Sequence, residues 1–294
     1  MTERPIVAVT AGDPSGIGPE IAVKATRHPR VVEVCRPVIY GPSEPADVEA
    51  FPAGVVDPRS GRAAYDAIAR ATADALAGRV HAIATAPVNK AAFAAAGIGW
   101  RGHTDLLAHL CGTPDVAMLF WSDRLRVVLA TVHVPLSAVP TALTRDRLRR
   151  VITLTAESLP AFGLASPRIA VAGLNPHAGE DGLMGDEEAR VMVPAIADAR
   201  AAGADVSGPY PADTLFVRAA RHEFDVVVAA YHDQGLVPVK LLAFGRAVNV
   251  TIGLPIIRTS VDHGTAFDIA RQGVADEGSL VEAMLLAADL ASRR

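Results

Sequence analysis

Residues 231–270 read YHDQGLVPVKLLAFGRAVNVTIGLPIIRTSVDHGTAFDIA, and they concentrate ionisable side chains between short apolar runs. The segment just before, residues 225–231 (DVVVAAY), is apolar and β-branched, which predicts a strand buried on both faces. His232 and Asp233 therefore follow the end of a strand. Because ligands of open α/β sheets bind at the carboxyl ends of strands, we expect a functional site at this point.

Length and composition limit the class of protein. The chain has 294 residues, half of them hydrophobic, which is enough for one large or two medium domains. A net charge of -4 and a pI near 6.1 provide no basic face for nucleic acid or an anionic membrane. Residues 1–16 lack a signal-peptide profile, and no apolar run approaches the roughly 20 residues of a membrane span. Cys35 and Cys111 form no CxxC pair, so we expect a reducing, cytoplasmic setting.

Lysine is rare in this chain. Lys24, Lys90 and Lys240 are the only lysines among 28 basic residues. An ammonium is a compact charge on a flexible stem, whereas the guanidinium of Arg is a planar fork. We therefore expect each lysine to stand where that compact charge is needed, with chance placement as the alternative.

Strand-like and helix-like segments alternate along the chain. This order predicts a largely parallel sheet with right-handed crossovers. The segment 115–132 resembles a hairpin with its turn at Ser122 and Asp123, and residues 41–60 suggest a surface excursion. The expected strands are residues 5–10, 36–40, 80–85, 169–174 and 225–231, and the expected helices are residues 19–26, 61–77 and 143–159.

Two segments suggest anion binding at a helix N-terminus. The loop AGDPSGIG contains Gly12, Asp13 and Gly16 between a strand and a helix, where backbone amides can approach a ligand. It matches neither GxGxxG nor the phosphate loop, so alone it is a weak signal. In RGHT, His103 and Thr104 precede the helical run DLLAHL and would suit a phosphate. The alternative is that Thr104 is only an N-cap and His103 a surface residue.

Three histidines follow strand-like runs: His133, His177 and His232. Three neutral imidazoles at one sheet edge would bind a divalent ion and leave positions open for substrate. The spacing is long-range and fits no local metal motif. It therefore indicates a metal site only if the fold brings the three strand ends together.

Nine motifs occur in an order that resembles the 4-hydroxythreonine-4-phosphate dehydrogenase family. They are GDPSGIGPE, TAPVNK, GHT, HVPL, NPHAGE, PADT, YHDQG, the series VK, VN, GLP and RTS, and DHGTAFDIA, spread over about residues 6 to 285. GDPSGIGPE and HGTAFDIARQGVAD are also similar, more distantly, to stretches of isopropylmalate and isocitrate dehydrogenases. Departures from the family are a short region around residues 41–62, Asp105 in place of Glu, and Arg271 after DIA.

The resemblance implies a homodimer of two-domain α/β/α subunits, similar to isocitrate and isopropylmalate dehydrogenases, with the active site in the interdomain cleft and completed by the partner subunit. We expect residues 1–102 with 250–294 to form the first domain and residues 103–249 the second. The family's metal ligands match His133, His177 and His232. Its substrate-binding positions match His103, Thr104, Lys240, Asn249 and Arg258.

The cofactor implied is NAD, with NADP as the alternative. We expect His263, Gly264, Thr265 and Asp268 to line its adenosine end, with Gly12, Asp13 and Gly16 close to the cofactor. Arg271 would alter this preference if it reached the adenosine ribose. The metal expected is zinc, with magnesium or cobalt as alternatives.

The activity implied is oxidation of 4-phosphooxy-L-threonine to a 3-keto acid, which loses carbon dioxide to give 3-amino-2-oxopropyl phosphate. Lys240, or Asp213 and Asp233 through water, would take the proton, and the sequence leaves that choice open. Alternatives within the family are oxidation of 4-phospho-D-erythronate or threonate, and of a dihydrodiol. Outside it, a metal-dependent hydrolase or lyase and a non-catalytic binding protein remain as alternatives.

Overall fold

The computed structural model describes residues 4–294, which form two compact units. Unit 1 contains the chain up to Pro114 together with Val248–Arg294, and unit 2 contains Asp115–Ala247. The sequence placed the boundary at residue 103. Helix α6 (His103–Leu110) therefore belongs to unit 1, so His103 and Thr104 share a unit with Arg258.

The sheet of unit 1 is parallel except at one edge. Its strand order is β2-β1-β3-β10-β9, and only β9 runs antiparallel to its neighbour β10. The strands are β1 Ile6–Thr10, β2 Arg36–Tyr40, β3 Ala82–Thr85, β9 Val248–Ile252 and β10 Arg258–Ser260. The carboxyl ends of β1, β3 and β10 consequently lie at the same edge.

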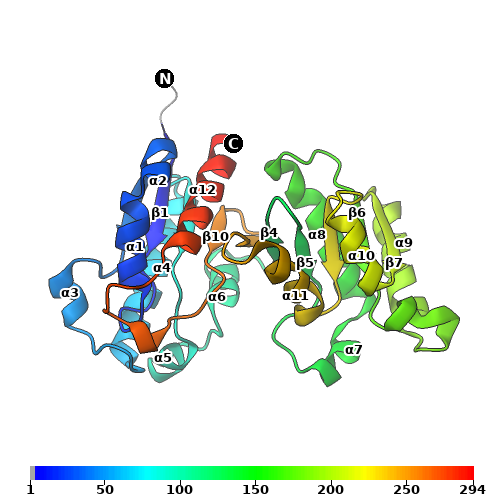
Figure 1. The fold of residues 1–294 in the computed structure, drawn as a ribbon, viewed down its shortest axis with the longest axis horizontal. Coiled ribbons are helices and arrows are strands. Elements are labelled where there is room, and N and C mark those ends of the chain that lie inside the picture. The colour runs from blue at the N-terminus through cyan, green and yellow to red at the C-terminus, as the bar shows by residue number, and fades with distance from the viewer. Residues whose placement is uncertain (1–3) are drawn as a thin grey trace. The chain divides into compact units, whose positions relative to one another are not determined.

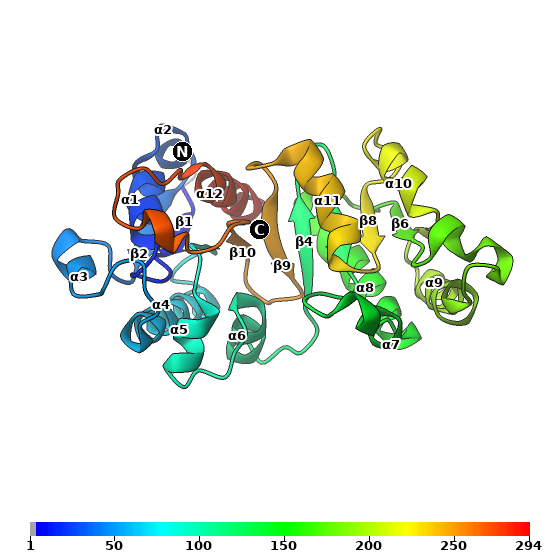
Figure 2. The same ribbon diagram turned by 60° about the horizontal axis from the view of Figure 1, so that its bottom comes forward.

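Helices cover both faces of this sheet (Figure 1, Figure 2). One face carries α1 (Gly18–Arg27), α2 (Pro29–Val34) and α12 (Gly278–Ser292), and the other carries α4 (Pro58–Leu76), α5 (Lys90–Ala95) and α6. Ile21 of α1, Ile68 of α4 and Ile83 of β3 are almost wholly buried between these layers. Burying one such side chain contributes about 1.5–3 kcal/mol, so the apolar faces hold the layers together.

Unit 2 repeats this architecture. Its strand order is β4-β5-β8-β6-β7, with β4 and β5 forming the expected antiparallel hairpin and the other pairs parallel. Helices α10 and α11 cover one face, and α8 and α9 the other (Figure 2). The elements are β4 Ala117–Trp121, β5 Val127–Leu129, α7 Val139–Ala142, α8 Arg145–Ser158, β6 Ile169–Ala172, α9 Val193–Ala201, β7 Val206–Tyr210, α10 Ala212–Ala219, β8 Val226–Ala229 and α11 His232–Ala243.

The expected surface excursion at residues 41–60 is wrong in part. It contains a short helix, α3 (Pro45–Glu49), and α4 begins within it, at Pro58. Asp57 caps α4 by accepting a hydrogen bond from the backbone N–H of Arg59, and Pro58 stands at the first helical position, where its missing N–H costs nothing. Within residues 4–294, no helix has the length and apolar character needed to cross a membrane.

Candidate active site

Arg258 is the most unusual buried side chain of unit 1. It begins β10 and is only 2% exposed. Its Nη1 donates to the Thr251 hydroxyl over 2.9 Å and its Nη2 to the Thr85 hydroxyl over 2.8 Å, whereas Nε has no partner among the described residues. Burial lowers its pKa to about 9, so the side chain remains a cation at neutral pH. No carboxylate of residues 4–294 forms an ion pair with it, and a buried charge without a counter-ion is costly.

The charge of Arg258 affects the protonation of His103. It is the first residue of α6, and its Nε2 is buried without a partner in the described chain. Burial, and next the Arg258 cation, hold the His103 pKa well below the usual value of 6.5, so the imidazole is neutral. A neutral imidazole can donate or accept one hydrogen bond to a ligand at Nε2.

Thr104 and Asn249 complete the substrate candidates of unit 1. Gly102, not Thr104, is the N-cap of α6, so the N-cap alternative for Thr104 is wrong, and its hydroxyl stands in the first turn beside the free amides. Asn249 on β9 is opposite Ser260 of β10, and its Oδ1 is buried and unbonded within residues 4–294. His103, Asn249 and Arg258 thus each leave one buried polar atom for a ligand.

Other segments of the protein occupy the space beside the glycines of the loop that follows β1. A Cβ at Gly12, whose φ is +70°, would meet the carbonyl oxygen of Pro87 at 2.3 Å, and a Cβ at Gly16 would meet the Thr265 carbonyl at 2.6 Å. The amide of Asp13 donates to Pro87, and that of Ile17 donates to Thr265 over 3.0 Å. The amides of Asp13 and Ile17 are therefore engaged within the protein, and the closeness of Gly12 and Gly16 to a cofactor stays a prediction.

Asp13 is wholly buried in that loop. Its Oδ1 accepts from the amide of Ser15 over 2.8 Å, whereas Oδ2 has no partner among residues 4–294. Burial raises its pKa from 3.8 to about 6. The hydrogen bond from Ser15 shows that Asp13 supports the loop, and its contact with the cofactor stays a prediction.

The 262–276 loop contains the residues expected at the adenosine end of NAD. His263, Gly264 and Asp268 are exposed, and Gly264 has open space beside it. Thr265 is 9% exposed because it packs on the glycine loop. The guanidinium of Arg271 donates to the backbone carbonyls of Val48 and Phe51. Its Nη2 is therefore engaged with the α3 segment.

Two of the three expected metal ligands meet in unit 2. His133 follows β5 and His232 begins α11 after β8, and these strands are parallel neighbours. The ring centroids lie 5.7 Å apart. Nδ1 of His232 lies 2.7 Å from Oδ1 of Asp233, which leaves Nε2 facing away from that carboxylate. A carboxylate on the second ring nitrogen is the usual support of a metal-binding imidazole.

His177 lies on a loop of unusual backbone. Residues 177–181 all have positive φ, and Nδ1 of His177 lies 2.6 Å from Oε2 of Glu180. The buried Glu188 holds this loop, since its two oxygens accept from the backbone N–H and the side-chain amide of Asn175 over 2.7 and 2.9 Å. Within residues 4–294 no three His, Cys, Asp or Glu side chains gather closely enough to hold a metal, so a single chain offers two of the three imidazoles.

The candidate proton acceptors differ in their surroundings. Asp233 is held by His232, and Oδ1 of Asp213, in the first turn of α10, accepts from the amide of Thr214 over 3.0 Å. Lys240 is exposed on α11 and forms no ion pair with any described residue. These contacts favour a role for Asp233 in orienting His232.

Sequence reasoning missed the residues that support these groups, namely Thr85 and Thr251 beneath Arg258, and Glu188 beneath His177. A signal for the threonines was present, because each is a buried polar residue in a strand of mainly apolar residues. Glu188 had no such signal, since a Glu in a helical run is usually exposed.

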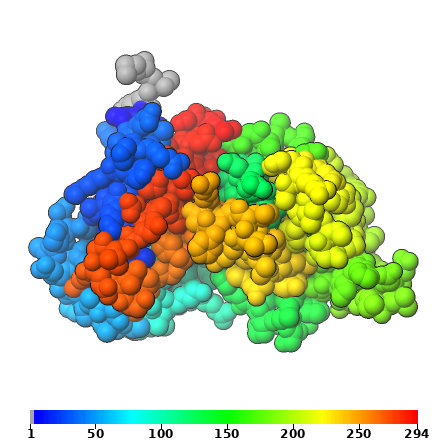
Figure 3. All heavy atoms as spheres, in the orientation of Figure 1, coloured from blue at the N-terminus to red at the C-terminus, as the bar shows by residue number. Residues whose placement is uncertain are grey.

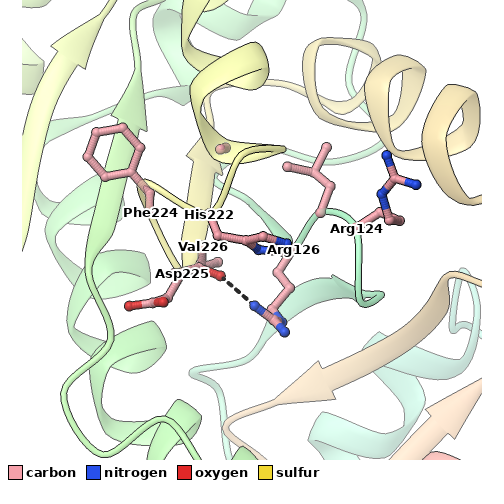
Figure 4. A pocket seen from close by; sticks show the side chains of 8 residues that line it. Arg124, Arg126, His222, Phe224, Asp225 and Val226 are labelled. Carbon is pink, nitrogen blue, oxygen red and sulfur yellow. Dashed lines mark hydrogen bonds between the residues drawn. The ribbon is translucent and has the colours of Figure 1, made fainter.

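A small hollow on unit 2 lies at the opposite strand ends. It is lined by the residues drawn in Figure 4: Arg124, Leu125, Arg126, Ala219, His222, Phe224, Asp225 and Val226. Arg126 donates to the Asp225 carbonyl over 3.4 Å and stacks 4.4 Å from the Trp121 ring centre. Because the hollow faces the amino ends of β5 and β8, it is separate from His133 and His232, which follow their carboxyl ends.

Two α/β units, each with a largely parallel sheet covered by helices on both faces, are a fold that solved dehydrogenases also adopt. The isocitrate dehydrogenase of Methylococcus capsulatus shares this fold, with a TM-score of 0.53, 18% identity and coverage of 98% of this chain and 88% of that chain. The model of the family described as "Pyridoxal phosphate biosynthetic protein PdxA" matches residues 19–287. The chain belongs to the PdxA family.

Individual relatives agree with this assignment. A 4-hydroxythreonine-4-phosphate dehydrogenase from Desulforapulum autotrophicum is 46% identical, over 98% of this chain and 96% of that protein. A D-threonate 4-phosphate dehydrogenase from Cupriavidus necator is 43% identical, over 99% and 98%. The crystal structure of 4-hydroxythreonine-4-phosphate dehydrogenase from Klebsiella pneumoniae has a TM-score of 0.89 and 41% identity, over 99% of both chains. The resemblance to this family and to its dehydrogenases is confirmed.

Proposed function

We propose that this chain oxidises the secondary alcohol of a phosphorylated hydroxy acid with NAD and a divalent metal. The substrate proposed is 4-phosphooxy-L-threonine, whose 3-keto product loses carbon dioxide to give 3-amino-2-oxopropyl phosphate. Membership of the PdxA family and the names of its relatives support this activity. The low cysteine content fits a cytoplasmic setting.

The observation that carries the proposal is the buried, unpaired cation of Arg258. A phosphate dianion would supply the missing counter-ion and accept hydrogen bonds from the guanidinium. The N-terminus of α6, with His103 and Thr104, adds further donors and a favourable dipole. Asn249 adds a polar group from β9. Lys240 remains a predicted substrate contact from unit 2.

His133, His177 and His232 are the residues that would hold the metal, and their neutral imidazoles suit zinc, with magnesium or cobalt as alternatives. When bound there, a divalent ion would supply polarisation of the substrate hydroxyl and stabilisation of negative charge on its oxygen. Asp233 and Glu180 orient His232 and His177 through their Nδ1 atoms. Because Asp233 is thus engaged, Lys240 and Asp213 remain as candidates to take the hydroxyl proton.

We infer that a second copy of the chain supplies the third imidazole. Within residues 4–294, His133 and His232 lie together and no third metal-ligating side chain joins them. The outer side of α11, which begins with His232, exposes Val237 and Leu241 one turn apart, and Phe244, directly after the helix, is also exposed; Leu241 is 82% and Phe244 78% exposed. This helix lies at the surface of unit 2 (Figure 3). An apolar stripe beside an incomplete metal site favours a homodimer that completes it.

The second candidate substrate is a 4-phospho-D-threonate or 4-phospho-D-erythronate. The relative named for D-threonate 4-phosphate is nearly as similar to this chain as those named for 4-hydroxythreonine 4-phosphate, at 43% against 46% identity. Both substrate classes carry a phosphate, which is the group proposed to bind Arg258. The difference between them lies at the other end of the molecule.

A substrate panel tests the proposal. The purified chain would be assayed for NAD reduction and carbon dioxide release with zinc, magnesium or cobalt and with each phosphorylated acid, the dephospho compounds and a dihydrodiol. We expect efficient turnover of a phosphorylated acid alone, abolished by chelation. Equal turnover of a dephospho compound or of the dihydrodiol would contradict the phosphate assignment, and hydrolysis or elimination without NAD reduction would contradict the redox assignment.

A further inference from the structure

Glu20 and Lys24 of α1 form four hydrogen bonds to one short segment of the 262–276 loop. Nζ of Lys24 donates to the carbonyls of Gly273 and Ala275 over 3.0 and 2.8 Å. Glu20 accepts from the amides of the same two residues, over 3.2 Å from Gly273 and 2.9 Å from Ala275. Nζ also donates to Oε1 of Glu20 over 2.8 Å. Both side chains are partly buried, with 16% and 33% of their surfaces exposed.

The chemistry of this contact explains a lysine at position 24. The three N–H bonds of an ammonium point to three corners of a tetrahedron, and here three acceptors surround them. A guanidinium presents its donors in one plane and cannot reproduce that arrangement. The positions of donor and acceptor cannot be exchanged, because the carbonyls of the loop face Lys24 and its amides face Glu20.

The 262–276 loop is fixed at further points. The Thr265 carbonyl accepts from the amide of Ile17, and Arg271 donates to the α3 segment. The exposed residues His263 and Gly264 stand near the loop's beginning and have few such contacts. The loop (orange-red) lies against α1 (blue) in Figure 1 and in Figure 3.

We propose that Glu20 and Lys24 are positioning residues for the cofactor: they hold residues 273–275 and so keep the 262–276 loop in the shape that binds the adenosine end of NAD. This inference rests on the proposed function, because it takes that loop as the NAD site. Neither side chain touches the cofactor in this assignment. Their loss should therefore weaken NAD binding while leaving substrate binding unchanged.

The test compares four variants in the full-length protein: Lys24→Met, Lys24→Arg, Glu20→Gln and the exchange Glu20→Lys with Lys24→Glu. The control is Arg293→Met, which removes a solvent-exposed i,i+4 ion pair with Asp289 on α12 of the same unit. Steady-state kinetics would give kcat and the Michaelis constants for NAD and for the phosphorylated substrate. Hydrogen exchange would report on the amides of Gly273 and Ala275.

We expect Lys24→Met and the exchange variant to raise KM for NAD by about tenfold or more, because several charge-assisted bonds are lost. KM for the substrate should stay at the wild-type value, and both amides should exchange faster. Lys24→Arg and Glu20→Gln should lie between these variants and wild type, and Arg293→Met should match wild type. If only the ion pair between the two side chains mattered, the exchange variant would have a wild-type KM for NAD. If the bonds to the loop matter, its KM for NAD stays raised.

Three results would overturn the inference: a wild-type KM for NAD in the exchange variant, an equal rise of both Michaelis constants in Lys24→Met, or unchanged protection of the two amides. Failure of the proposed function looks different. In that case the wild-type protein itself would not reduce NAD, while the exchange measurement would still show whether Glu20 and Lys24 hold the loop.

Discussion

Nη2 of Arg258 lies 2.8 Å from the hydroxyl of Thr85, a residue 173 positions earlier in the chain. This contact orients the guanidinium without neutralising it, since a hydroxyl carries no charge. The cation is thereby fixed in orientation, and the described part of the protein supplies no anion to pair with it.

Replacement of Arg258 by Met should separate stability from binding. Removing a buried, uncompensated charge in favour of an apolar side chain of similar length should leave the free energy of unfolding of the ligand-free protein unchanged or raise it by about 1–4 kcal/mol. The same change should raise KM for the phosphorylated substrate by about a hundredfold or more. Denaturant titration and kinetics measure the two effects, and inorganic phosphate should raise the melting temperature of wild type only.

Arg126→Met is the matched control for that variant, because the Nε of Arg126 is, like that of Arg258, buried without a partner among the described residues, and its side chain lines the hollow of Figure 4. It should leave KM for the substrate unchanged. Thr104→Val should raise that constant by a smaller factor, about tenfold, with KM for NAD unaffected. A substrate KM that does not respond to Arg258→Met would exclude Arg258 from phosphate binding.

Substrate capture should depend on pH through Arg258. Its pKa in the ligand-free protein is about 9, and the protonated form is the one that binds an anion. The ratio kcat/KM reports ionisation in the free enzyme, so it should fall as pH rises through about 9, whereas kcat, measured with the dianion bound, should fall only at higher pH. In Arg258→Met this alkaline limb should be absent from the pH profile.

The metal prediction rests on His232 and Asp233. His232→Ala should lose bound metal and turnover together while circular dichroism and the melting temperature of the metal-free protein stay near wild type. Asp233→Asn should weaken metal affinity by about 10–100-fold, since it changes the support of the ligand and not the ligand itself. Metal content by elemental analysis is the readout, and Asp186→Asn, at an exposed ion pair of unit 2, is the control. A metal-free His232→Ala protein with full activity would eliminate the site.

Arg271 should influence the affinity for the cofactor and not the choice between NAD and NADP. Its Nη2 donates to the carbonyls of Val48 and Phe51, so it is committed to the α3 segment and not to a 2′-phosphate. We expect wild type to prefer NAD, and Arg271→Met to raise KM for NAD and for NADP in parallel. Initial rates with both cofactors measure this. A wild-type preference for NADP of about tenfold that Arg271→Met abolishes would show that the arginine reads the 2′-phosphate instead.

Asp13 should make the protein less stable as pH rises. Its pKa is about 6 in the folded protein and near 3.8 when unfolded, so the folded state binds the proton more tightly. The contribution of that proton to the free energy of unfolding is complete below pH 3.8 and is lost as pH rises through about 6. This contribution is about 3 kcal/mol. Asp13→Asn should remove this dependence. Urea unfolding of both proteins between these pH values would measure it, and parallel curves would refute the assignment.

The sequence alone indicated most of the strands and helices, the class of fold and the family. The run at residues 225–231 is apolar and β-branched, and local patterning of this kind was sufficient to place β8. Ordered motifs such as NPHAGE and DHGTAFDIA were sufficient to indicate the family, which the comparisons confirm. The start of α4 was missed because its signal was a cap, Asp57 before Pro58, placed inside a stretch rich in Pro and Gly.

Only the tertiary structure decided how the candidate residues are used. The pairing of Arg258 with Thr85 and Thr251, the neutral state of His103 and the contact of Arg271 with α3 depend on burial and on segments far apart in the chain. Sequence spacing contains no information about such desolvation. The same holds for Lys24, whose rarity was visible in the sequence but whose three acceptors were brought together by the fold. Local propensity acts over a few residues, whereas the electrostatics of a site depend on everything packed around it.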